Sequence, residues 1–347
     1  PALMRVRVLS SGRLPEHWVR RFSEAYDFAH YEWDESQPPA AEDELVARIS
    51  GYGVFVTEED EVTRGVIARS PDLAVVIDTR AAPVNVDVEA ATEHGVAVIN
   101  TPGRNADAVG DLTVMLMVMV ARNVWPAMVA LRDGSWVKRG LLPSYLAHQG
   151  HELRGKTVGL VGLGATGLAT ARRLAGYGVR LLVHDPYVDT RLATEVSAEL
   201  VELDELLGSA DFVSLHVPLS PVTRGLLGAR ELRLLKPTAF LVNCARAGLV
   251  DPEALLATLR EGRIAGAALD VFTHEPLPTD DPLLSLPNVV LLPHLGGATH
   301  EVTDHQSRIA WESLAAFLDL EGDPINVVNP EAVAAARSRL QGTPTPA

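Results

Sequence analysis

Residues 157–167 read TVGLVGLGATG, a short apolar run that leads into three glycines, Gly162, Gly164 and Gly167. A short apolar run bounded by turn residues is typical of a buried strand, and the residues after Gly167 have a helix-compatible pattern. Asp185 stands about 20 residues beyond the turn, at the end of the next apolar run. This order of strand, glycine turn, helix and acid predicts the phosphate-binding turn of an α/β dinucleotide-binding unit.

The chemistry of this turn also favours one cofactor. Glycines let the backbone approach a pyrophosphate, and the helix start at Ala165 and Thr166 offers N–H groups and the positive end of a helix dipole. The Asp185 carboxylate can accept hydrogen bonds from ribose hydroxyls and repels a 2′-phosphate, so we predict NAD rather than NADP. Arg191 is the one nearby cation that could reverse this preference. The alternative is a strand-to-helix turn that binds nothing.

The same alternation of apolar runs and helix-compatible stretches extends along the chain. The runs of the first part are 5–9, 53–57, 73–78 and 96–100, and those of the second part are 157–162, 180–184, 212–217, 239–243, 266–270 and 289–292. Near-continuous apolar strands separated by helices indicate parallel sheets that are buried on both faces. The sequence therefore predicts the α/β class.

The length and two long helical runs indicate two domains. A chain of 347 residues exceeds the usual domain size of about 100 to 200 residues. Helix-compatible runs at 107–122 and 298–320 flank the second set of strands. We expect two Rossmann-like or flavodoxin-like domains with parallel sheets, the cofactor domain being inserted in the substrate domain. The expected boundaries are 1–105 plus 298–330 for the substrate domain, 106–297 for the NAD-binding domain, and 331–347 for a disordered tail.

The helix expected at 107–122 is apolar all round its middle. Such a helix is too apolar for a solvated surface, and one small domain could hardly bury it alone. We expect it to pack at a domain interface and on a second copy of the chain, which predicts a homodimer.

Composition excludes several classes of partner and location. The net charge of −15 disfavours nucleic acid and anionic membranes as partners. The longest apolar run, at 112–121, is half of what a membrane span needs, and the first residues lack the apolar core of a signal peptide. A single cysteine, Cys244, allows no intrachain disulfide and favours the reducing cytoplasm. His300, Asp304 and His305 lack further ligands at metal-binding spacing, so no metal is predicted.

Three later segments add motifs of a known family. They are VNCARAGLVD at 242–251, ALDVFTHEP at 268–276 and LPHLGGAT at 292–299, supported by TPGRNA at 101–106 and LRGKT at 153–157. Together with the glycine turn they resemble the D-isomer-specific 2-hydroxyacid dehydrogenase family over roughly residues 5 to 330. The wording of the motifs, including DGSW at 133–136, is most similar to the 3-phosphoglycerate dehydrogenases of that family.

The resemblance implies a catalytic set and a reaction. It places the catalytic arginine, glutamate and histidine of the family on Arg246, Glu275 and His294. The implied reaction is the NAD-dependent interconversion of a small anionic D-2-hydroxy acid and its 2-oxo acid. Arg246 would bind the substrate carboxylate, His294 would exchange the hydroxyl proton, and Glu275 would favour the protonated imidazole and fix its tautomer.

The resemblance also implies further cofactor contacts. Val217, Cys244 and Ala245 would lie beside the adenosine and nicotinamide portions, and Asp270 would face the nicotinamide side. Gly296 and Gly297 would permit close backbone approach. We interpret Cys244 as a small residue of the pocket rather than a nucleophile, because no base is assigned to it.

The substrate loop departs from the family pattern. The stretch TRAAPVNVD at 79–87 has Ala81 and Ala82 where glycines are usual, and Pro83 lacks a backbone donor. We expect this loop, with Arg80 as a second cation, to contact the substrate; the alternative for Arg80 is an exposed loop arginine. Because the loop departs from this pattern, alternative functions stay open. They are a glyoxylate or hydroxypyruvate reductase, a sugar-acid dehydrogenase, and a non-catalytic NADH-sensing binding protein.

Overall fold

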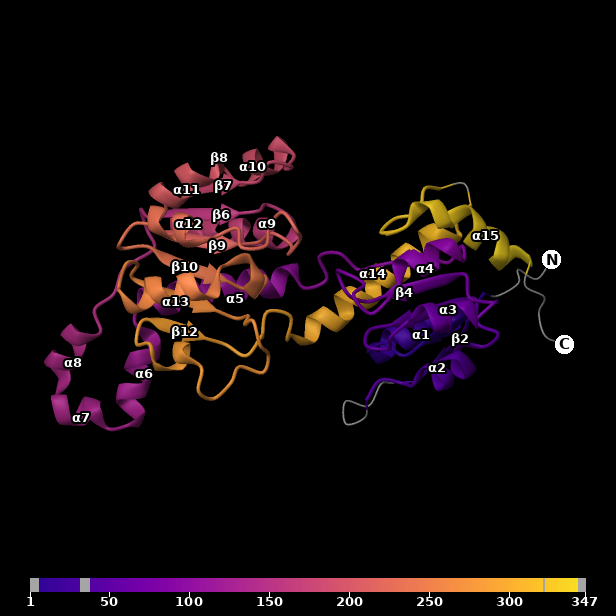
Figure 1. Cartoon of the computed structure of the whole chain (residues 1–347), viewed down its shortest axis with the longest axis horizontal. Coiled ribbons are helices and arrows are strands. Elements are labelled where there is room, and N and C mark those ends of the chain that lie inside the picture. The colour runs from indigo at the N-terminus through magenta and orange to yellow at the C-terminus, as the bar shows by residue number, and fades with distance from the viewer. Residues whose placement is uncertain (1–5, 32–37, 321, 343–347) are drawn as a thin grey trace. The chain divides into compact units, whose positions relative to one another are not determined.

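The computed structural model describes residues 6–31, 38–320 and 322–342 and divides the chain into two compact units. Unit 1 comprises 1–104 and 299–347, and unit 2 comprises 105–298 (Figure 1). The chain thus leaves unit 1 once and returns to it once. Each unit is built on one parallel sheet, so the predicted α/β class is confirmed.

The sheet of unit 1 has the strand order β2-β1-β3-β4-β5. Its strands are β1 (Arg7–Ser10), β2 (Asp27–His30), β3 (Val54–Thr57), β4 (Val75–Asp78) and β5 (Ala97–Ile99). All four pairings are parallel. This is the flavodoxin-like order, in which the carboxyl ends of all strands meet at one edge.

Helices cover both faces of this sheet because its strands are apolar on both sides. The helices are α1 (Glu16–Ala25), α2 (Glu42–Ile49), α3 (Arg64–Ala68), α4 (Val88–Glu93) and α14 (His300–Leu318). In β3, Val54 and Val56 face the cluster that includes residues of α1 and α14, whereas Phe55 faces the cluster that includes α2, α3 and α4. This alternation is the period-2 pattern of a strand buried on both faces.

The end of the chain is ordered further than we expected. The 3-10 helix η4 (Pro330–Ala332) leads into α15 (Val333–Gly342), in which Ala336 is buried. Asn329 anchors this segment, because its side chain accepts from Val98 N at 2.7 Å and donates to Val96 O at 3.0 Å. The predicted disordered tail is therefore wrong for residues 331–342, since long-range contacts supply an order that the local composition does not reveal. Residues 343–347 lie outside the described part.

The sheet of unit 2 has the order β12-β11-β10-β9-β6-β7-β8, all parallel. Its strands are β6 (Thr157–Val161), β7 (Arg180–His184), β8 (Glu199–Leu200), β9 (Phe212–Leu215), β10 (Phe240–Asn243), β11 (Gly266–Leu269) and β12 (Val289–Leu291). The order reverses between β6 and β9. In open α/β sheets, ligands bind beyond the carboxyl ends of the strands at such a switch point.

Two helical layers cover this sheet. The elements of unit 2 are α5 (Ala106–Ala121), α6 (Val124–Arg132), α7 (Ser135–Arg139), α8 (Leu141–Ala147), α9 (Ala165–Leu174), η1 (Ala175–Tyr177), α10 (Thr190–Glu195), α11 (Leu203–Ser209), α12 (Ala229–Leu234), η2 (Ala247–Leu249), α13 (Pro252–Arg260) and η3 (Pro282–Ser285). Residues of α5, α9 and α10 form one core cluster with the sheet, and residues of α11, α12 and α13 form the other.

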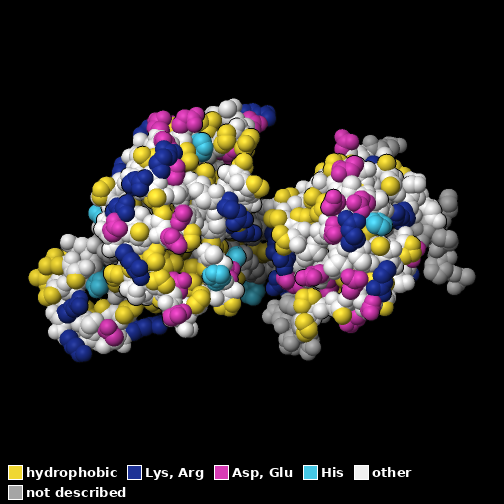
Figure 2. All heavy atoms as spheres, in the orientation of Figure 1, with side chains coloured by type: hydrophobic (Ala, Val, Ile, Leu, Met, Phe, Trp, Pro, Cys, Tyr) yellow, Lys and Arg dark blue, Asp and Glu magenta, His cyan; other side chains and the backbone are white. Residues whose placement is uncertain are grey.

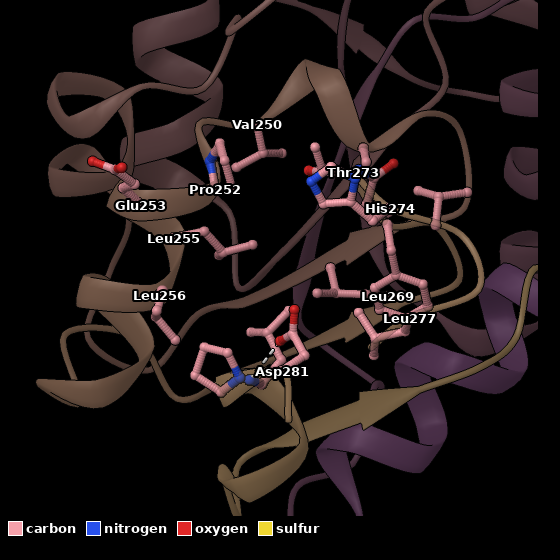
Figure 3. Close-up of a pocket in the computed structure, with 16 residues that line it drawn as sticks. Val250, Pro252, Glu253, Leu255, Leu256, Leu269, Thr273, His274, Leu277 and Asp281 are labelled. Carbon is pink, nitrogen blue, oxygen red and sulfur yellow. Dashed lines mark hydrogen bonds between the residues drawn. The ribbon is translucent and has the colours of Figure 1, made fainter. Parts of the chain in front are cut away.

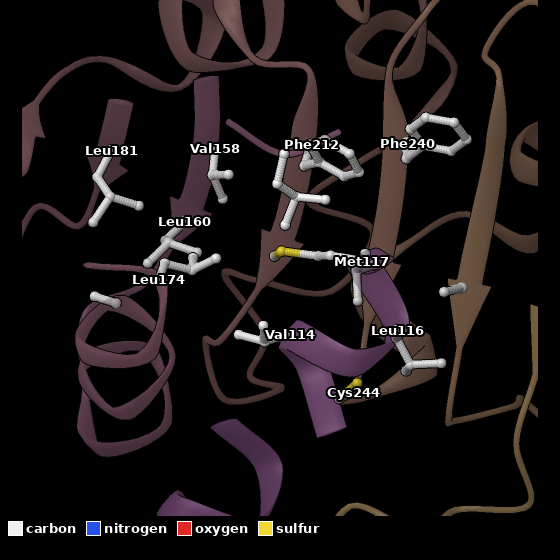
Figure 4. Close-up of a cluster of buried hydrophobic side chains, with 14 of the residues drawn as sticks. Val114, Leu116, Met117, Val158, Leu160, Leu174, Leu181, Phe212, Phe240 and Cys244 are labelled. Atoms are coloured by element: carbon white, nitrogen blue, oxygen red, sulfur yellow. The ribbon is translucent and has the colours of Figure 1, made fainter. Parts of the chain in front are cut away.

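Much of α5 is buried within unit 2. Leu116 and Met117 are fully buried in the cluster that contains Phe212 and Phe240 (Figure 4). Gly110 lets α5 approach α9, because a Cβ there would lie 3.2 Å from the Cβ of Ala169. Burial of each large apolar side chain is worth about 1.5–3 kcal/mol. The packed core thus accounts for the buried side chains of 107–122. Met115 is 39% exposed, and packing of this helix on a second copy stays a prediction.

Many exposed apolar side chains lie on the next three helices, which we call the apolar arm, residues 124–147. Its exposed members are Trp125, Met128, Val129, Leu131, Trp136, Val137, Leu141, Leu142, Tyr145 and Leu146. Figure 2 shows hydrophobic side chains gathered over this segment at the lower left. No single helix in the described ranges is long and apolar enough to cross a membrane; only α5 and α6 together pass that test, and they are bent by 69°.

Candidate active site

The glycine turn connects β6 to α9 in a conformation that its glycines make possible. Gly162 has φ +97°, a region that disfavours residues with a Cβ. A Cβ on Gly167 would lie 2.2 Å from Gly162 O, so no side chain fits there. A Cβ on Gly164 would meet nothing within 4 Å, and no side chain caps the helix that begins at Ala165. The turn is thus closed on its protein side and open in front of the helix N-terminus, near Thr166, as a pyrophosphate requires.

Asp185 follows β7 and is held against this turn. Its Oδ2 accepts from Leu163 N at 2.8 Å and its Oδ1 from Tyr187 N at 3.0 Å. Both bonds orient the carboxylate beside the glycine turn, where the sequence motif places a ribose ligand. Arg191, the cation that could favour a 2′-phosphate, forms a two-point ion pair with Asp189.

The segment after β9 packs directly on the turn. A Cβ on Gly162 would lie 2.8 Å from Val217 Cγ1 and 3.0 Å from His216 C, so Val217 is adjacent to the glycines. Burial lowers the pKa of His216 to about 4, and its Nε2 lies 2.9 Å from Ser214 Oγ. His216 is therefore a neutral core histidine at physiological pH.

Arg246 leaves β10 through a turn that Asn243 organises. Asn243 donates from Nδ2 to Arg246 O at 2.9 Å and accepts from Ala245 N at 3.0 Å. The Arg246 side chain is exposed and donates to Ala245 O at 2.7 Å. It has no carboxylate partner in the described part of the chain. Burial raises the pKa of the adjacent Cys244 thiol to about 12, which keeps it protonated and a poor nucleophile.

His294 and Glu275 form a direct pair. His294 Nδ1 lies 2.6 Å from Glu275 Oε2, and Phe272 N donates to Glu275 Oε1 at 2.8 Å. Partial burial raises the pKa of Glu275, but the hydrogen bonds from His294 and Phe272 and the charges of His294 and Arg246 outweigh it and lower the pKa. The His294 side chain is 48% exposed, so its Nε2 is available to a ligand while Nδ1 is held. Such an imidazole can exchange a proton with a bound hydroxyl or carbonyl oxygen.

Asp270 clamps the turn that carries His294. Its two oxygens accept from Leu295 N and Gly296 N, each at 2.7 Å, and its side chain is fully buried. A Cβ on Gly296 would lie 3.1 Å from Asp270 Oδ2, so glycine permits this close approach, whereas Gly297 is less crowded. Burial raises the pKa of Asp270, and these two N–H bonds oppose that rise. The carboxylate oxygens that we expected to face the cofactor thus both bind the backbone of the turn.

The predicted substrate loop lies in unit 1, after β4. Arg80 donates from Nε to Glu58 O at 2.6 Å and pairs with Glu59. Thr101 N donates to Arg80 O, and Asn100 Nδ2 to Ala81 O. The N–H groups of Ala81 and Ala82 donate no hydrogen bond within the described residues, so they remain available to an anion.

A buried carboxylate that the motifs did not reveal organises the same edge of the sheet. Glu58 is 2% exposed and binds Arg13, Arg104 and Gln306. Burial raises the pKa of Glu58, but the hydrogen bonds and charges of the two arginines lower it to about 2. The run of four acids at 58–61, directly after an apolar strand, is the sequence signal that could have identified it.

The described residues contain no group of three or more histidine, cysteine or acidic side chains that could hold a metal ion. Asp304, which we considered in the sequence, instead accepts from Trp18 Nε1 at 2.7 Å and pairs with His17.

Known proteins similar to this chain point to one family. The family described as D-isomer specific 2-hydroxyacid dehydrogenase, NAD binding domain, matches residues 114–296. A glyoxylate reductase of Thermococcus litoralis is 36% identical over 326 residues, 94% of this chain and 97% of that protein. A D-3-phosphoglycerate dehydrogenase of Methanocaldococcus jannaschii is 39% identical over 291 residues, 83% of this chain and 54% of that protein.

A solved structure supports the same conclusion. It is an NADPH-dependent glyoxylate/hydroxypyruvate reductase from Sinorhizobium meliloti in complex with NADP and malonate. It superposes with a TM-score of 0.74 at 30% identity, over 94% of this chain and 98% of that one. The protein described here is accordingly a nicotinamide-dependent oxidoreductase of small 2-hydroxy and 2-oxo acids. The chain belongs to the D-isomer-specific 2-hydroxyacid dehydrogenase family.

Proposed function

We propose that the chain reduces short 2-oxo acids of the glyoxylate and hydroxypyruvate type with NADH, and that phosphorylated acids are poor substrates. The observation that carries this proposal is the pairing of the arginines. Arg246 has no carboxylate partner within the described residues, whereas Arg80 pairs with Glu59 and Arg104 with Glu58. One cation is therefore available for one carboxylate, but the loop arginines are neutralised by glutamates and offer little to a phosphate.

The proposed roles follow from the contacts of three side chains. Arg246 binds the substrate carboxylate with its guanidinium fork and orients the neighbouring carbonyl. A nicotinamide dinucleotide, when bound, supplies hydride transfer to and from the carbonyl carbon. His294 donates a proton from Nε2 to the carbonyl oxygen during reduction and accepts it in the reverse direction. Glu275 stabilises the protonated imidazole through Nδ1 and fixes the ring orientation.

We propose that unit 2 binds the cofactor and prefers NADH over NADPH. The Asp185 carboxylate beside the glycine turn repels a 2′-phosphate, and the Arg191 side chain is already paired with Asp189. The Sinorhizobium relative, by contrast, is NADPH-dependent. Comparison of kcat/KM for NADH and for NADPH tests the proposed preference. We expect kcat/KM to be at least about tenfold higher with NADH.

The test of the substrate proposal is NADH absorbance with a panel of 2-oxo acids. We expect turnover with glyoxylate and hydroxypyruvate, and a kcat/KM at least about tenfold lower with 3-phosphohydroxypyruvate. A preference for the phosphorylated acid would contradict the proposal and favour a phosphoglycerate dehydrogenase, to which the Methanocaldococcus relative is assigned. NADH binding without turnover of any acid would contradict both.

We further propose that the chain forms a homodimer, with the apolar arm, which directly follows the helix at 107–122, as the main contact surface. Leu141 is 74% exposed and Leu142 is 65% exposed, and large apolar side chains continue along all three helices of the arm. Contiguous apolar surface of this kind is typical of a protein–protein interface. We also propose a cytoplasmic location, which the single free cysteine favours.

A further inference from the structure

Unit 2 contains a cavity of about 220 Å³ that none of the proposed catalytic or cofactor residues lines. It lies beyond the ends of β10 and β11, between the start of α13 and the segment 271–283 (Figure 3). Leu255 of α13 and Leu269 of β11 are buried residues on its walls, and Leu277 lines the side of the loop. The cavity is therefore a separate apolar site next to the active site.

The charged residues that line this cavity are acidic, beside the polar residues Asn243, Thr273 and His274. Asp281 and Glu253 are its carboxylates, and no lysine or arginine lines it. Asp281 Oδ1 accepts from Leu283 N at 2.9 Å, while neither carboxylate has an ion-pair partner in the described part of the chain. An apolar cavity with unpaired carboxylates is complementary to a ligand with an apolar body and a cationic end.

We propose that this cavity binds a small amine that carries one aromatic ring or an aliphatic body of similar size. The size of the cavity sets the size of the ligand: a cavity of about 150 Å³ lined by apolar side chains accommodates benzene. The larger volume here leaves room for a short aminoalkyl arm. The ring contacts the leucines, and the ammonium group lies near Asp281.

The ligand also acts on the catalytic pair, because one wall of the cavity is the loop that precedes Glu275. Val271, Phe272 and His274 line the cavity, and Phe272 N donates to Glu275 Oε1 at 2.8 Å. Glu275 in turn holds His294 Nδ1. A ligand against Phe272 therefore changes the hydrogen bonding of Glu275 from outside the active site. Binding itself does not depend on the proposed substrate.

The experiment measures binding of 2-phenylethylamine by calorimetry, with 2-phenylethanol and phenylacetate as neutral and anionic analogues. It uses the full-length chain and three variants. Leu256→Phe fills the cavity, Asp281→Asn removes the charge but keeps a residue that can cap η3, and Asp280→Asn changes a neighbouring acid that does not line the cavity. The imidazole NMR signal of His294 reports the effect on the catalytic pair without turnover.

We expect saturable binding of the amine, weaker binding of the alcohol and weakest binding of the acid. Asp281→Asn weakens amine binding about three- to tenfold, Leu256→Phe by about tenfold or more, and Asp280→Asn leaves it unchanged. Equal binding of all three compounds, or equal effects of Asp280→Asn and Asp281→Asn, overturns the proposal. Absence of saturable binding, including the case in which a second copy of the chain fills the cavity, overturns it as well. Absence of 2-oxo acid reduction alone contradicts only the proposed function.

Discussion

Glu275 divides its two oxygens between the catalytic histidine and the backbone of its own loop. Oε2 lies 2.6 Å from His294 Nδ1, and Oε1 accepts from Phe272 N. A neutral amide at this position can accept one of these bonds but not both, and it cannot stabilise a charged imidazole. The charge of Glu275, rather than its shape, is therefore what the proposed proton transfer requires.

Glu275→Gln tests this point through the pH dependence of kcat. The pKa of Glu275 is lowered below its ordinary value of 4.5, so its carboxylate stays charged in mild acid. The negative charge is lost only when the pH falls through this lowered pKa. We expect the variant to lose about tenfold to hundredfold in kcat at neutral pH. We also expect it to lack the acid limb that this carboxylate contributes. Initial rates over the pH range give both, and an unchanged profile would contradict the assigned role.

Glu58 and Asp78 are buried at the same edge of the unit 1 sheet, yet we predict opposite effects of pH on stability. The pKa of Glu58 is lowered to about 2 by Arg13 and Arg104, against the effect of burial. Its contribution, about 3 kcal/mol, is present above pH 4.5 and is lost as the pH falls toward 2. Burial raises the pKa of Asp78 to about 7, so stability falls as the pH rises from 3.8 to 7.

Thermal unfolding of two variants measures these contributions. We expect Glu58→Gln to be less stable than the wild type at pH 7, with the difference shrinking as the pH falls below 4.5. Asp78→Asn is expected to gain stability relative to the wild type as the pH rises from 4 to 8, because it removes the cost of ionising a buried carboxyl. Parallel changes in the two variants would contradict the opposite signs.

Sequence motifs predicted which residues form the candidate catalytic set but not the contacts between them. Arg246, Glu275 and His294 were predicted because each lies in a motif that resembles one family. Their contacts were not derivable from spacing, since Glu275 and His294 are 19 positions apart and meet only through the fold. The hydrogen bonds from the backbone of the His294 turn to Asp270 could not be predicted either, because backbone N–H groups carry no sequence signal.

At the scale of elements, the glycine turn was predictable because its three glycines have different physical tasks. Gly162 and Gly167 are required by the turn itself, whereas the space in front of Gly164 is empty. We therefore expect Gly162 and Gly167 to be needed for folding and Gly164 to be needed for cofactor binding.

Two alanine substitutions test this separation. We expect Gly164→Ala to fold normally, because its φ of −67° suits any residue, and to weaken NADH binding at least about tenfold by filling the open side. Gly167→Ala is expected to lower the melting temperature, because its Cβ would lie 2.2 Å from Gly162 O. Calorimetry with NADH and thermal unfolding separate the two effects. Tight NADH binding by Gly164→Ala would show that the pyrophosphate does not lie there.

Two helices show the limits of sequence patterns for different physical reasons. The helix at 333–342 is alanine-rich with few large apolar residues, so its order comes from Ala336 and from Asn329, which binds the backbone of the strand β5 region. The apolar character of 107–122 was recognised, but periodicity cannot tell a helix buried within one domain from one buried between subunits. Here residues of this helix lie in the core of unit 2.

At the scale of the whole molecule, the apolar arm is the surface on which we predict a second copy. The double variant Leu141→Glu, Leu142→Glu places two charges on side chains of the arm that are 74% and 65% exposed. Burial of unpaired charges in an interface is costly. We expect light scattering at micromolar concentration to show a dimer for the wild type and a monomer for this variant. Val222→Glu, an 82% exposed site outside the arm, is the matched control and remains dimeric.

We propose that His294 transfers a proton to a short 2-oxo acid while the rest of the site binds the reactants. NADH consumption at saturating glyoxylate, measured for the wild type and for His294→Gln with NADH affinity determined in parallel, tests it most directly. We predict a loss in kcat of about 10²- to 10⁴-fold with NADH affinity within about twofold of the wild type. Equal turnover by the two proteins, with NADH affinity unchanged, would contradict the account.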